Sequence, residues 1–102
     1  MQALERDLQA ERASALARIN DLFLKALEVW EALESGQLPP LASAEAERER
    51  RLELRDFTAE RVWMLLVQRE SVGLRDHREL LQRVPQEIRR RIGPRRRIPG
   101  AE

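Results

Sequence analysis

The residue best suited to proton transfer is the single histidine, His77. It stands at the start of a predicted short helix and directly after Asp76, the setting of a general base that is oriented by a carboxylate. No nucleophile lies near it in the sequence, although Ser14, Ser43 and Ser71 could approach it in space. A solvated surface histidine is the simpler interpretation, so the sequence assigns no catalytic residue.

The sequence offers few side chains that could bind a metal ion or a cofactor. The chain has no cysteine, which excludes thiolate metal sites. A dinuclear carboxylate site in a helical bundle uses Glu-x-x-His pairs, and this sequence contains none. Its glycines are isolated and form no phosphate-binding loop. We therefore expect no metal ion and no cofactor, and an enzyme ranks third among the functions considered.

The strongest signal for ligand binding is a group of arginines near the C-terminus: Arg89, Arg90, Arg91, Arg95, Arg96 and Arg97. Such side chains could contact phosphates and give salt-sensitive binding to nucleic acid without sequence preference. However, the rest of the chain is net acidic, and no aromatic residue accompanies the arginines. A solvated tail, with arginines favourably placed at a helix C-terminus, is the simpler interpretation. Weak nucleic-acid binding is the alternative function.

The chain is organised around a run of consecutive apolar residues, Val62–Val67. At about 3.6 residues per turn, such a run is apolar on every side of a helix and must be covered on every side. It is far shorter than the roughly 20 residues that span a membrane. Met1 is followed by a charged segment rather than a secretory signal. We therefore expect a soluble, cytoplasmic protein.

Composition and pattern predict an all-α fold. Charged residues make up 36% of the chain, aromatic residues only 4%, and the strong helix formers Ala, Leu, Glu and Arg dominate. A short Pro-Pro connection predicts that the second long helix returns antiparallel to the first. The prediction is a long antiparallel helical hairpin with two short C-terminal helices, in one domain over residues 1–93. The expected elements are helices over 2–35, 43–72, 77–83 and 85–92, and a flexible basic tail over 94–102.

The first helix carries a wide apolar stripe. Leu8, Ala15, Leu22 and Val29 recur every seven residues, beside two further apolar rows. This stripe exceeds what one neighbouring helix can bury, so we expect two hairpins to form a symmetric dimer with a four-helix core, positioned towards the open end of the hairpin. The expected interface residues are Leu22, Phe23, Trp30, Trp63 and Leu66. The favoured function is a non-catalytic module for protein–protein interaction or oligomerisation, with itself or an unidentified protein as partner.

The last third of the chain carries a V-Q-R-E-x-x-G-L-R-D segment from Val67 to Asp76 and a V-P-x-E-I element from Val84 to Ile88. In these segments the chain resembles a family of small bacterial helical proteins of unknown function. The resemblance implies a free-standing cytoplasmic bacterial protein. It carries no known activity, so it transfers no functional residue. It also suggests that Gln68–Asp76 is one unit, for which we predict ion pairs among Arg69, Glu70, Arg75 and Asp76 across the bend at Gly73.

Overall fold

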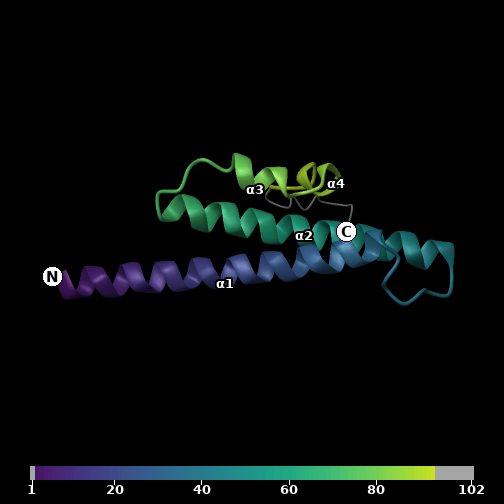
Figure 1. The fold of residues 1–102 in the computed structure, drawn as a ribbon, viewed down its shortest axis with the longest axis horizontal. Coiled ribbons are helices and arrows are strands. Elements are labelled where there is room, and N and C mark those ends of the chain that lie inside the picture. The colour runs from purple at the N-terminus through teal and green to yellow at the C-terminus, as the bar shows by residue number, and fades with distance from the viewer. Residues whose placement is uncertain (1, 94–102) are drawn as a thin grey trace, which may run out of the picture.

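The computed structural model describes residues 2–93 and confirms the predicted all-α hairpin with short C-terminal helices. Its elements are α1 (Gln2–Glu34), α2 (Ala44–Ser71), α3 (Arg78–Gln82) and α4 (Gln86–Arg89), shown in Figure 1. The predicted tail over 94–102, with Arg95, Arg96 and Arg97, lies outside the described residues. None of the helices in the described range is long and apolar enough to cross a membrane. The dimeric core stays a prediction.

The hairpin turn is defined by a glycine at the end of α1 and a serine at the start of α2. Gly36 has a φ of 72°, and the Gln37 N–H donates to the Ala32 carbonyl at 2.8 Å, which closes the end of α1. The Ser43 hydroxyl accepts from the Ala46 N–H at 3.0 Å and caps the start of α2. The two long helices therefore run antiparallel, side by side (Figure 1).

A second glycine turns the chain back over α2. Gly73 has a φ of 90°, and the Leu74 N–H donates to the Arg69 carbonyl at 2.9 Å. The segment of α3 and α4 then returns along α2 (Figure 1). Both short helices are shorter than predicted: α3 begins after His77 instead of at it, and α4 occupies only the first half of the expected 85–92 span.

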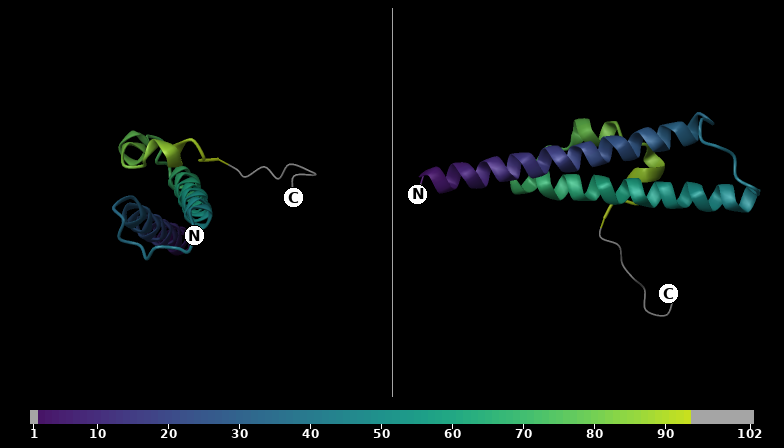
Figure 2. Two further views of the ribbon diagram at one scale, coloured as in Figure 1. Left: turned by 90° about the vertical axis from the view of Figure 1, so that its right-hand side faces the viewer. Right: turned by 90° about the horizontal axis from the view of Figure 1, so that it is seen from below.

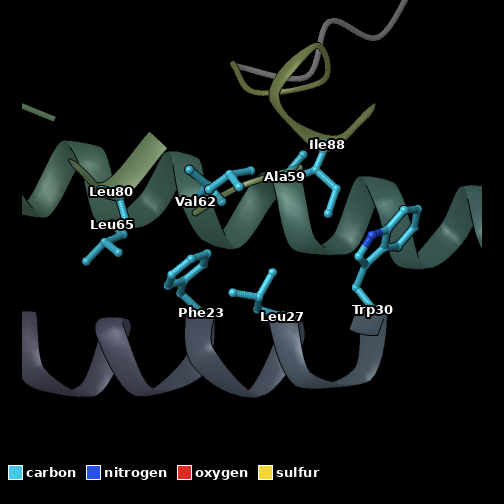
Figure 3. Close-up of a cluster of buried hydrophobic side chains, with 9 residues drawn as sticks. Phe23, Leu27, Trp30, Ala59, Val62, Leu65, Leu80 and Ile88 are labelled. Atoms are coloured by element: carbon cyan, nitrogen blue, oxygen red, sulfur yellow. The ribbon is translucent and has the colours of Figure 1, made fainter. Parts of the chain in front are cut away.

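The core lies where three segments meet. Phe23, Leu27 and Trp30 of α1 face Ala59, Val62 and Leu65 of α2, and Leu80, Val84 and Ile88 cover them from the C-terminal segment (Figure 3). On α2 the core lies in the half nearer the open end, as predicted, whereas on α1 it lies in the half nearer the turn. Residues 2–14 of α1 are exposed throughout, and α1 extends beyond the end of α2 (Figure 2). The core therefore sits in the middle of the hairpin.

Candidate functional site: an uncovered apolar face

The residues predicted to form a dimer interface separate into two groups. Phe23 and Trp30 are 0% and 1% exposed within a single chain, so the expectation that a second copy covers them is wrong. The segments α2, α3 and α4 already bury them. Trp63 and Leu66 are half-buried, and only Leu22 remains exposed.

Of the eleven large apolar side chains that are exposed among the described residues, four stand directly before a buried residue on one of the two long helices. They are Leu22 and Val29 on α1 and Phe57 and Met64 on α2, exposed by 39%, 41%, 45% and 36%. We call the surface that they form the bare face. Of these four, only Leu22 belongs to the interface residues expected from the sequence. The seven-residue spacing between Phe57 and Met64, which repeats that of the two α1 residues, was the signal for the other helix.

The bare face spans both long helices on the side away from α3 and α4. Because α1 and α2 run antiparallel, a two-fold rotation about an axis perpendicular to both helices exchanges them. A residue that directly precedes a core residue on α1 therefore lies on the same side of the hairpin as one that directly precedes a core residue on α2. Leu24 and Leu66, which follow core residues, are instead partly buried against the core. The right-hand view of Figure 2 shows α1 and α2 side by side, with the C-terminal helices behind them.

An arginine on α2 joins the three segments of the covered side. Arg51 Nη2 donates to Glu34 Oε1 of α1 and to Glu87 Oε1 of α4, both at 2.7 Å, and its guanidinium lies 4.8 Å from the centre of the Trp30 ring. The hydrogen bond to Glu87 raises the pKa of Arg51 above its usual value despite burial, and Arg51 in turn lowers the pKa of Glu87. These contacts fix the C-terminal segment to one side of the hairpin.

Of the arginines proposed to contact phosphates, the structure brings Arg90 and Arg91 together in one groove, which Arg55 and Glu87 also line. Arg91 Nε donates to Asp56 Oδ1 at 3.0 Å, so it helps to hold the C-terminal segment on α2. Burial opposes ionisation of Asp56, but hydrogen bonds from Arg55 and Arg91 outweigh it and lower the pKa of this carboxyl. Arg89 and Arg90 are exposed. The other three lie outside residues 2–93.

His77 lies at the bend between α2 and α3, where it accepts a hydrogen bond from Arg69. Its Nδ1 accepts from Arg69 Nε at 3.1 Å, and Arg69 Nη2 also donates to the Asp76 carbonyl at 3.0 Å. The Asp76 carboxylate pairs with Arg78 instead of orienting His77. Arg69 thus bridges the bend by donating to the ring nitrogen of His77 and to the backbone carbonyl of Asp76. The predicted ion pair between Arg69 and the Asp76 carboxylate is therefore wrong. Within the described hydrogen bonds, no serine hydroxyl contacts His77.

Over residues 2–93, no group of histidine and acidic side chains is arranged to hold a metal ion. No protein-family model, curated protein or solved structure matches the chain. The resemblance to a bacterial family therefore stays a prediction.

Proposed function

We propose that this chain is a non-catalytic helical module that associates with a second copy of itself through the bare face. One observation carries the proposal: four large apolar side chains, at matching positions on both long helices, remain exposed after the chain has folded. Scattered exposed apolar residues are normal on a protein surface, but these four lie together on one face of the hairpin. Their burial would add two helices to the two already present and give a four-helix core.

The side of the hairpin that carries the bare face has room for a dimer interface. The 28 residues of α2 rise about 42 Å, and two adjacent helices are about 20 Å wide. The outline of this side of the hairpin, polar residues included, therefore measures about 800 Å², and a typical specific interface buries about 800 Å² of accessible surface on each partner.

Sedimentation at micromolar concentrations tests the proposal. We expect the wild-type chain to sediment as a dimer, and the variant Leu22→Gln with Met64→Gln to sediment as a folded monomer. Leu41→Gln is the matched control, because Leu41 is equally exposed, at 40%, but lies in the loop between α1 and α2. A monomeric wild-type chain would refute the proposal.

The rival prediction of nucleic-acid binding has less support from the described residues, since Arg91 is engaged with Asp56. Titration of duplex DNA at increasing salt tests it. Absence of binding at about 50 mM salt would exclude this function.

A further inference from the structure

Two edges of opposite charge border the bare face. On α1, Arg18 and Lys25 lie beside the apolar residues, and on α2 the corresponding positions hold Glu53 and Glu60. The spacing is the same on both helices: each charged residue stands four positions before one of the four apolar residues. At helical pitch, this offset places the charges on the same side of the helix as the apolar residues. The α1 edge therefore carries two basic residues and the α2 edge two acidic ones. On α2, Arg61 also lies over the Phe57 ring, with its guanidinium 4.8 Å from the ring centre.

All four charged side chains are exposed, and none forms a salt bridge within residues 2–93. Other charged residues of the hairpin behave differently. Arg51, Asp56 and Glu87, for example, are engaged in ion pairs that fix the C-terminal segment. The edge charges are thus available to an external partner at the border of an apolar surface.

Two symmetric ways of stacking one hairpin on another can be distinguished by these edges. If the two-fold axis runs across the helices, α1 faces α1 and basic edges meet. If the axis runs along the helices, α1 of each copy faces α2 of the other, so that each basic edge meets an acidic edge. Like charges that face each other oppose association, and opposite charges fix the register of an interface.

Building on the proposed self-association, we propose that the partner on the bare face is a second copy related by a two-fold axis parallel to the helices, selected by pairing of Arg18 and Lys25 with the partner's Glu53 and Glu60. The heights along the hairpin agree with this pairing. Arg51 contacts Trp30 and Glu34 near one end of the hairpin. Gln68 shares a groove with Ala15 near the other. Lys25 therefore lies at the height of the segment between Glu53 and Glu60, which a rotation about this axis preserves. Arg18 lines the same groove as Gln68, so it lies towards the open end and Glu60 is the nearer of the two glutamates.

Charge reversal tests the arrangement. The variant Arg18→Glu with Lys25→Glu places acidic edges against acidic edges, and Glu53→Lys with Glu60→Lys does the same with basic edges. We expect each to weaken the dimer by about tenfold or more, measured by sedimentation equilibrium at low salt. The variant with all four reversals restores opposite charges across the interface and should return the dimerisation constant towards the wild-type value.

The outcomes separate this inference from the proposed function. If the wild-type chain dimerises and the fourfold variant is as weak as the twofold variants, the symmetry proposed here is wrong while self-association stands. The same holds if neither twofold variant weakens the dimer. If the wild-type chain is a monomer, both proposals fail. Circular dichroism of each variant reports whether its helices are retained.

Discussion

The two sides of the hairpin start from similar sequences and end in different environments. On one side, Phe23 and Leu65 are sealed by the C-terminal segment; on the other, their immediate neighbours Leu22 and Met64 stay exposed. Hydrophobicity does not separate the two sides, because large apolar residues occupy both. The difference lies in the third layer: Leu80, Val84 and Ile88 cover one side, and no described segment covers the other.

This contrast indicates which contacts stabilise one chain and which remain for a partner. The covered side carries the closely packed side chains and the Arg51 ion pairs. The bare face carries apolar residues with unpaired charges at its edges. Substitutions on the first should change the free energy of unfolding, and substitutions on the second should change association.

The largest difference is expected between two adjacent residues. Phe23→Ala should lower the free energy of unfolding by about 3–5 kcal/mol, because it leaves a cavity in the core. Leu22→Ala should lower it by less than about 1 kcal/mol, since the side chain is already exposed. Urea denaturation at protein concentrations below dimerisation measures both. Equal effects would contradict the distinction between the two sides.

The cover itself is tested by Ile88→Ala. Ile88 is fully buried although it belongs to a helix of only four residues. Its truncation should cost about 2–5 kcal/mol, close to that of a core residue in a long helix. Arg89→Ala is the control, because Arg89 is the exposed next residue. A negligible effect of Ile88→Ala would mean that the C-terminal segment does not seal the core.

The bend that brings the cover back depends on Gly73. Because its φ of 90° disfavours side chains, Gly73→Ala should lower the free energy of unfolding by about 1–2 kcal/mol. The empty space around this residue excludes a steric clash as the cause. Gly73→Asn should cost less, since asparagine tolerates this conformation better. Thermal unfolding of both variants measures the effect, and the opposite ranking would count against a conformational origin.

The ion pairs of the covered side predict a modest pH dependence. Arginine contacts lower the pKa of Glu87 and Asp56, so both carboxylates contribute stability that is complete above about pH 5 and is lost as the pH falls below about 4. Each partly exposed pair should contribute about 1 kcal/mol or less. Urea denaturation between neutral and acidic pH should show a weaker dependence for Glu87→Gln than for Glu28→Gln. Identical pH profiles for the two variants would show that the Arg51–Glu87 pair does not contribute to the free energy of unfolding.

Much of the fold was predictable because its signals are local. Gly36 and Ser43 define the hairpin turn through backbone geometry and capping, and the long helices agree with their predicted bounds to within one residue. The predicted short helices are longer than the observed ones. The prediction follows an apolar period of four through Val84, Ile88 and Ile92, but α4 is a single turn.

The candidate site was only partly predictable, for a physical reason. Periodicity identifies which residues share a face, but it does not tell which face a third segment will cover. Phe23 and Trp30 were therefore assigned to an interface that α2 and the C-terminal segment fill within one chain. Leu22 is exposed in the single chain, and its place in an interface stays a prediction. Phe57 and Met64 lie on the helix whose apolar run is expected to be covered on every side, so the sequence does not predict that they are exposed.

The most direct test of the central claim is the solvent accessibility of the Met64 methyl group as a function of protein concentration. The chain has only two methionines, so one substitution assigns the signal in a methyl NMR spectrum. With a soluble paramagnetic agent, we predict strong relaxation of this signal at high dilution and protection at concentrations where the mass is twice the 11.9 kDa of one chain. Relaxation that is equally strong at every concentration would contradict association through the bare face.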